Sequence, residues 1–338
     1  MSSTAEGAVR RPRLTPAMAD ARRAVRECLQ RHTSSVSDGA TFLIAVSGGA
    51  DSLALAWAAA FELPRHGYRP MAVIVDHQLQ EGSDDVAQTA KVVVEGFGLE
   101  AEIVRVSVSG DGGVENAARE ARYEALEGYA SKHGAEGVML AHTLDDQAET
   151  VLMGLTRGSG PQSLLGMAEV NGMWWRPFLR LRRQTTVGAL QDIGVSWWDD
   201  PHNTNLAFLR PRIRSEVLPR LEEAVGPGVT QALARTAELM REDADYLDHQ
   251  AVAAIPNVMV GSTLDAERLH ELPRVIASRV VRRVIANATG EALSHSHTEQ
   301  VMALLTAWKG QGPVNVPGGT VERSGSRLIV TPIQGCRD

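Results

Sequence analysis

Short apolar runs alternate with amphipathic stretches along the first half of the chain. The apolar runs predict buried strands at 42–46, 71–75, 103–108 and 138–141. The stretches that follow them predict helices at 52–61, 83–98, 115–133 and 146–155, with Ser83 as the N-cap of the second. Strands that alternate with helices favour a parallel sheet covered by helices on both faces. We therefore predict an α/β, Rossmann-like fold, in which ligands bind at the carboxyl ends of the strands.

The pattern changes after residue 170 and becomes mainly helical. An extended segment is expected at 174–178, and the Gly/Val-rich stretch 313–331 predicts a small β unit. The predicted helices cover 184–193, 208–225, 230–253, 272–288 and 296–308, with a break at 226–228. These patterns divide the chain into a disordered tail at 1–15, an α/β domain at 16–215 and a mainly helical domain with a terminal β unit at 216–335.

Composition narrows the class of protein. The chain has 338 residues, of which 43% are hydrophobic and 22% are charged, as in ordinary globular proteins. Its two cysteines, Cys28 and Cys336, are too few and too far apart in the sequence to build a zinc ribbon or an iron–sulfur cluster. We therefore expect a reducing compartment, the cytoplasm. No apolar stretch is long enough to span a bilayer, so a membrane partner is not expected.

The loop between the first strand and the first helix of this pattern is the best candidate for chemistry. Its two glycines let the backbone turn sharply, and the amides of the following helix N-terminus attract anions. Asp51 would repel phosphates unless a cation lay between them, so we predict that it binds Mg²⁺. No lysine follows a glycine, so the P-loop motif G-x-x-x-x-G-K-[ST] is absent and chemistry at a γ-phosphate is disfavoured. The candidate nucleotide-binding residues of this loop are Ser47, Gly48, Gly49, Ala50, Asp51 and Ser52.

Further polar residues follow the second and fourth predicted strands. Asp76 and His77 end the second strand, so they are expected at the same sheet edge as the loop and are further candidates for the nucleotide site. His142 follows the fourth strand, where a structural and a catalytic role are both open. Asp146 and Glu149 are three residues apart at a helix start and share one face. Such a pair can hold a cationic amino acid, although acids in a first turn also serve as helix caps.

The loop and the segments behind it resemble a known family. S-G-G-x-D-S after the first strand is the signature of the PP-loop ATPases, in which this loop holds the β,γ-pyrophosphate of ATP while the substrate attacks the α-phosphate. The stretches 75–77, 115–123, 141–150, 157–160 and 164–167 occur in the order found in the tRNA(Ile)-lysidine synthetases. The resemblance covers about residues 41–220 and implies an adenine-nucleotide α-hydrolase-like fold for the sheet domain.

The resemblance implies a ligase that uses ATP and Mg²⁺. Family members join free L-lysine to C2 of the wobble cytidine of tRNA(Ile) with a CAU anticodon, through an adenylated cytidine, and release AMP and pyrophosphate. It implies that Asp146 and Glu149 recognise lysine and that the C-terminal domain helps to hold the tRNA. Arg119 and Arg157 could neutralise charge on the α-phosphate, and Asp146 is a candidate base for the attacking amine. The expected tRNA contacts are Arg122, Arg210, Arg212 and Arg214, and a homodimer is among the expected assemblies.

The chain departs from the family pattern at accessory positions, and three other functions fit parts of the sequence. Many members carry a second histidine where this chain has Thr143, and the pattern R-N-x-I-R reads R-P-R-I-R at 210–214. One alternative is a PP-loop enzyme that thiolates tRNA, although such chemistry usually needs more cysteines than this chain has. An amide-forming synthetase with a small-molecule substrate is a second alternative. A non-enzymatic regulatory protein that binds ATP is a third.

Overall fold

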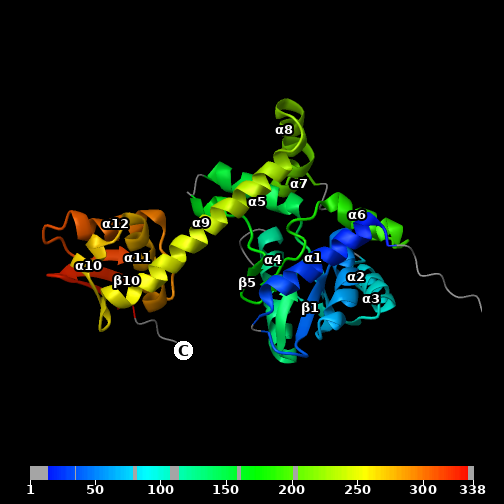
Figure 1. Ribbon diagram of the computed structural model, residues 1–338, viewed down its shortest axis with the longest axis horizontal. Coiled ribbons are helices and arrows are strands. Elements are labelled where there is room, and N and C mark those ends of the chain that lie inside the picture. The colour runs from blue at the N-terminus through cyan, green and yellow to red at the C-terminus, as the bar shows by residue number, and fades with distance from the viewer. Residues whose placement is uncertain are drawn as a thin grey trace, which may run out of the picture. The chain divides into compact units, whose positions relative to one another are not determined.

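The computed structural model describes residues 14–34, 36–78, 82–106, 114–157, 161–200 and 205–333 (Figure 1). The chain forms two compact units, Met1–Glu238 and Leu239–Asp338. The division falls inside the long helix α9, Val229–Val258, whereas the sequence pattern placed it after residue 215. The difference arises because the helix α8 ends at the break Gly226–Gly228, after which α9 runs without interruption from the first unit into the second. Of the predicted tail 1–15, only Leu14 and Thr15 lie within the described residues.

A six-stranded sheet forms the centre of the first unit. Its strand order is β3-β2-β1-β4-β6-β5, and every neighbouring pair is parallel except β5 with β6. The strands are β1 Thr41–Val46, β2 Arg69–Asp76, β3 Glu100–Arg105, β4 Ala135–Met139, β5 Val170–Asn171 and β6 Trp174–Trp175. The predicted parallel sheet is therefore confirmed, and the loops that follow β1, β2 and β4 leave it at one edge.

Helices cover both faces of this sheet (Figure 1). Phe42, Ile44 and Val46 of β1 point to one face, while Leu43 and Ala45 point to the other, as the two-residue period of a strand requires. The first face packs against α1 Pro16–His32, α2 Ala50–Arg65, α3 Ser83–Gly96 and α6 Arg183–Asp192. The second face packs against α4 Val114–His133. Because both faces are buried, the central strand β1 is almost continuously apolar rather than alternating.

Two local details differ from the sequence expectations. Helix α1 was not predicted; Thr15 caps it by accepting a hydrogen bond from the Met18 amide at 3.3 Å. Ser83 was expected to cap α3, but Gly82 is the N-cap, and its φ of +80° suits glycine. Residues 107 and 108 of the third predicted strand lie outside the described residues.

The last part of the first unit is helical and irregular. Helix α5, Leu144–Arg157, is followed by the short 3₁₀ helix η1, Pro161–Leu164. The single helix predicted at 208–225 is built from α7 Leu209–Arg212, the π-helical turn η3 Ile213–Val217 and α8 Leu218–Val225. Single π turns inside helices occur often at functional sites, and this one carries Arg214.

The second unit packs helices against a small sheet, which confirms the predicted helical region with a terminal β unit. Its sheet is antiparallel, in the order β7-β8-β11-β10-β9. The strands are β7 Met259–Val260, β8 Thr263–Asp265, β9 Val314–Val316, β10 Gly319–Ser324 and β11 Arg327–Pro332. The helices are the C-terminal part of α9 with α10 Ala266–Glu271, α11 Arg274–Thr289 and α12 His295–Thr306. β7, β8 and α10 were not predicted. No described helix is long and apolar enough to span a bilayer.

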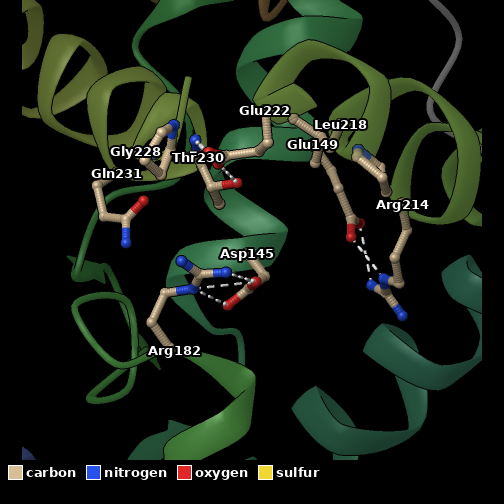
Figure 2. Close-up of a pocket in the computed structure, with 11 residues that line it drawn as sticks. Asp145, Glu149, Arg182, Arg214, Leu218, Glu222, Gly228, Thr230 and Gln231 are labelled. Carbon is tan, nitrogen blue, oxygen red and sulfur yellow. Dashed lines mark hydrogen bonds and ion pairs between the residues drawn. The ribbon is translucent and has the colours of Figure 1, made fainter. Parts of the chain in front are cut away.

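The turn from α8 into α9 is fastened by one carboxylate. Glu222 accepts hydrogen bonds from the amides of Gly228 at 2.5 Å and Thr230 at 2.9 Å, and from the Thr230 hydroxyl at 2.9 Å (Figure 2). These donors, those of Thr230 first, lower the pKa of Glu222 to about 2. A lowered folded-state pKa means that the carboxylate stabilises the fold above its ordinary pKa, and that this contribution is lost as the pH falls toward 2.

We predict that Glu222→Gln lowers the melting temperature at pH 7 because the amide keeps one acceptor oxygen in place of two charged ones. The difference from the wild type should shrink as the pH falls from about 4.5 toward 2. Thermal melts across this range measure it, with the exposed neighbour Glu223→Gln as the matched control. A difference that stays constant across the range would show that the charge of Glu222 is not what fastens the turn.

Candidate functional site

The loop 47–52 has the geometry of an anion cradle. It leaves the carboxyl end of β1, turns at Gly48 with a φ of +80°, and enters α2 after the N-cap Gly49. No side chain caps α2, so the first amides of this 16-residue helix stay available to a ligand. The Ser52 hydroxyl accepts a hydrogen bond from the Ser47 amide at 3.1 Å and donates to the Gly49 carbonyl at 2.9 Å, which fixes the turn.

Asp51 lies in the first turn of α2 and is held by two residues of α6. Its Oδ2 is 3.1 Å from Nη2 of Arg183, and its Oδ1 accepts a hydrogen bond from the hydroxyl of Thr186. Burial raises the pKa of Asp51, and the two α6 residues oppose that shift. The carboxylate therefore faces the loop with its orientation already fixed.

Asp146 uses its two oxygens for two different purposes. Oδ2 accepts hydrogen bonds from the amide and the hydroxyl of Thr143, both at 2.8 Å, which caps the start of α5. Oδ1 is 3.0 Å from Nη2 of Arg214 and 3.3 Å from Nη2 of Arg183. Burial opposes the charge of Asp146, but Arg183, His142 and Arg214 outweigh it and keep the pKa below its ordinary value. The helix-cap interpretation is therefore correct for one oxygen only.

Glu149 is completely buried one turn further along α5. Its carboxylate forms a two-pronged ion pair with Arg214, with Oε1 2.6 Å from Nε and Oε2 3.0 Å from Nη2 (Figure 2). Burial raises the pKa of Glu149, and Arg214 opposes that shift. Arg214 was expected to contact tRNA, but its guanidinium instead pairs with the two carboxylates of α5.

These side chains form one row of alternating charge, which we call the charge row. Its members, in order, are Asp51, Arg183, Asp146, Arg214 and Glu149. A cavity of about 350 Å³ opens beside its Glu149 end and is walled by α5, η3, α8 and the start of α9 (Figure 2). Asp145 and Arg182 also line the cavity and pair with each other at 3.1 Å. The loop thus adjoins one end of the row and a cavity the other.

A second polar group gathers at the strand ends. Asp76 is buried, and its Oδ1 accepts from the Gln78 amide at 3.0 Å. Asp76 Oδ2 and the Nδ1 atoms of His77 and His142 are buried without a hydrogen-bond partner among the described residues. Burial first, and then Arg122, lowers the pKa of His77; burial likewise lowers that of His142. Both imidazoles are therefore neutral at pH 7.

The predicted arginines occupy different environments. Arg119 is exposed and donates to the Tyr123 hydroxyl at 3.3 Å, while burial lowers the pKa of Arg122. Arg157 is exposed at the end of α5 and donates to the Met153 carbonyl at 3.2 Å. Arg212 is exposed on α7 and Arg210 is half-buried there. The structure therefore brings Arg122 toward the histidines and places Arg157 at the C-terminal end of α5.

Sequence reasoning did not assign Arg183 or Thr186 to the nucleotide loop. A signal for Arg183 exists, because an arginine at the first position of a helix opposes the helix dipole and needs a local carboxylate to offset it. Asp145 supplies one further contact by accepting from the Arg183 amide at 2.9 Å. Thr186 carries no comparable signal, since the sequence does not distinguish a threonine that bonds a distant carboxylate from any other threonine in a helix.

Comparison with known proteins identifies the family. A family profile described as "PP-loop domain" matches residues 20–221, and one described as "TilS substrate binding domain" matches residues 264–329. A tRNA(Ile)-lysidine synthase of Leifsonia xyli is 49% identical over 303 residues, which are 88% of this chain and 91% of that protein. The enzyme of Streptomyces coelicolor is 49% identical over 85% of this chain and 84% of its own length. That of Thermobifida fusca is 48% identical over 87% of this chain and 92% of its own length.

A solved structure supports the fold independently. The U34-tRNA thiolase of Methanococcus maripaludis superposes with a TM-score of 0.55 at 17% identity, covering 67% of this chain and 80% of that one. At this identity the likeness concerns the fold alone. The matched profiles and the relatives together show more: the chain belongs to the tRNA(Ile)-lysidine synthase family of PP-loop enzymes and is a tRNA-modifying ligase.

Proposed function

We propose that this enzyme joins L-lysine to C2 of the wobble cytidine of tRNA(Ile) with a CAU anticodon, through an adenylated cytidine, and releases AMP and pyrophosphate. The observation that carries the proposal is the charge row. It contains three carboxylates and two guanidiniums, so it is one positive charge short, and it lies between the nucleotide loop and a cavity. An amino acid with a cationic side chain supplies the missing charge beside the loop.

The loop 47–52 is assigned to the β- and γ-phosphates of ATP because its amides and hydroxyls converge there. Asp76 and His77 lie at the neighbouring strand end and are assigned to the nucleotide as well. Asp51 offers the hard oxygen donor that Mg²⁺ prefers, and each of its oxygens keeps a lone pair beyond its contacts with Arg183 and Thr186. Mg²⁺ held by Asp51 and the phosphates would neutralise charge on the leaving pyrophosphate.

Asp146 and Glu149 are assigned to lysine. The lowered pKa of Asp146 suits a residue that holds a cation and makes it a poor acceptor for the proton of the attacking amine. We therefore move the role of base from Asp146 to Glu149, whose pKa burial raises. Neutral His142, with its unpartnered Nδ1, is assigned to orient the reacting cytidine through a hydrogen bond.

The arginines outside the charge row are assigned to the tRNA and the reacting phosphate. Arg119 and Arg157 are assigned to the α-phosphate, and Arg122, Arg210 and Arg212 to tRNA phosphates. Arg214 leaves this set because its donors already pair with Glu149 and Asp146. The second unit is assigned to the body of the tRNA, and the reaction to the cytoplasm, where free lysine, ATP and tRNA meet.

We predict that ATP is cleaved to AMP and pyrophosphate only when tRNA(Ile) is present, because the acceptor is a base of the tRNA. Thin-layer chromatography of α-labelled ATP measures the product. tRNA(Met) with the same anticodon triplet serves as the control substrate. Formation of ADP would contradict the assignment of the loop to the outer two phosphates.

We predict that Asp146→Asn and Glu149→Gln retain tRNA adenylation but lower lysine incorporation at least tenfold, because each removes one carboxylate that faces the ammonium. Labelled lysine incorporated into tRNA and AMP bound to tRNA are measured side by side. Glu149→Gln should also lower stability by about 1–3 kcal/mol, because Arg214 loses its two-pronged partner but keeps the ion pair with Asp146.

Glu136→Gln is the matched control for this pair, because Glu136 is exposed on β4 at the opposite edge of the same sheet. If Asp146→Asn and Glu149→Gln both fold and incorporate lysine normally, the two carboxylates do not bind lysine and serve only as structural partners of Arg183 and Arg214.

A further inference from the structure

Arg183 connects the two halves of the proposed site through a single nitrogen. Its Nη2 lies 3.1 Å from Oδ2 of Asp51, at the nucleotide loop, and 3.3 Å from Oδ1 of Asp146, at the lysine site. A terminal guanidinium nitrogen carries two hydrogens, so it can serve both oxygens at once. Neither contact is the short, two-pronged pair that Arg214 forms with Glu149. Arg183 is therefore shared between two carboxylates rather than committed to one.

The backbone of Arg183 is fixed while its side chain keeps spare donors. Its amide donates to Asp145 at 2.9 Å, which holds the start of α6 against the start of α5. Its Nε is buried and has no hydrogen-bond partner among the described residues. A planar guanidinium with unused donors binds phosphate through two hydrogen bonds. A polyphosphate in the loop 47–52 would therefore draw the side chain away from Asp146.

Removing Arg183 from Asp146 changes the lysine site. Oδ1 of Asp146 would lose one of its two guanidinium partners and gain a free acceptor for an ammonium group, while Oδ2 would stay bonded to Thr143. While Arg183 contacts this oxygen, it repels a second cation. Two other titratable or charged groups face Asp146: Arg214 of η3, and the neutral His142 in the loop before α5. Arg214 also acts on Asp51 electrostatically, but only Arg183 lies within ion-pair distance of both carboxylates.

We propose that Arg183 is a positioning residue that couples the two ligands: nucleotide in the loop 47–52 draws Arg183 off Asp146 and so tightens the binding of lysine at Asp146 and Glu149. This inference rests on the proposed function, because it needs both ligands at these places. Thermodynamic linkage requires the effect to be reciprocal, so lysine tightens nucleotide binding by the same factor.

Calorimetric titration of the full chain tests the coupling without any catalytic step. The dissociation constant of L-lysine is measured with and without saturating α,β-methylene-ATP and Mg²⁺, in the absence of tRNA. The wild type should bind lysine about fivefold or more tightly with the nucleotide analogue present. Arg183→Gln should bring this ratio close to one. Arg183→Lys should give an intermediate ratio, because an ammonium keeps the positive charge but lacks the planar set of donors with which a guanidinium forms two parallel hydrogen bonds.

Arg180→Gln is the matched control, because it removes the same charge from an exposed position just before α6. Arg180 pairs with Glu238 and not with the charge row. It should keep the wild-type ratio. If Arg183→Gln keeps the wild-type ratio of lysine dissociation constants, the coupling role is overturned while the proposed function stays intact. If the glutamine variant does not fold, the same conclusion is drawn from Arg183→Lys. A wild type that binds the nucleotide analogue but no lysine would overturn the proposed function, and the coupling with it.

Discussion

The charge row is the constraint on which the rest of the site depends. Five ionised side chains from α2, α5, α6 and η3 meet where burial would otherwise make each charge costly, so each must lie against an opposite charge. The resulting order of signs fixes the four segments relative to one another. The loop that follows β1 and the acid pair of α5 are thereby held side by side, although they lie nearly one hundred positions apart in the sequence.

The same arrangement shifts the pKa values of its three carboxylates in different directions. Asp146 is surrounded by donors that keep its pKa low, while burial raises the pKa of Asp51 and of Glu149 at the two ends of the row. The environments of the three carboxylates therefore differ even though they share two arginines. Such divergence is common where one site must bind a cation, neutralise phosphates and accept a proton.

Local sequence patterns predicted the parts of the site that depend on neighbours in the chain. The sheet, the turn at Gly48 and the shared face of Asp146 and Glu149 follow from strand alternation, glycine geometry and helical spacing. Thr186 gives no local signal, and the signal at Arg183 could not identify its partner, because Asp51 lies on another helix more than 130 positions away. For the same reason Arg214 was placed on the tRNA: its sequence neighbours are arginines, and its partners are distant carboxylates.

The most direct test of the account is nucleoside analysis of the tRNA product. tRNA(Ile) with a CAU anticodon is incubated with the enzyme, Mg²⁺, ATP and isotopically labelled lysine, then digested and examined by mass spectrometry. The account predicts that the label resides in the wobble nucleoside and survives mild base, as an amine joined to C2 of cytidine must. Label that is absent from that nucleoside, or that mild base releases as free lysine from an ester, would contradict it.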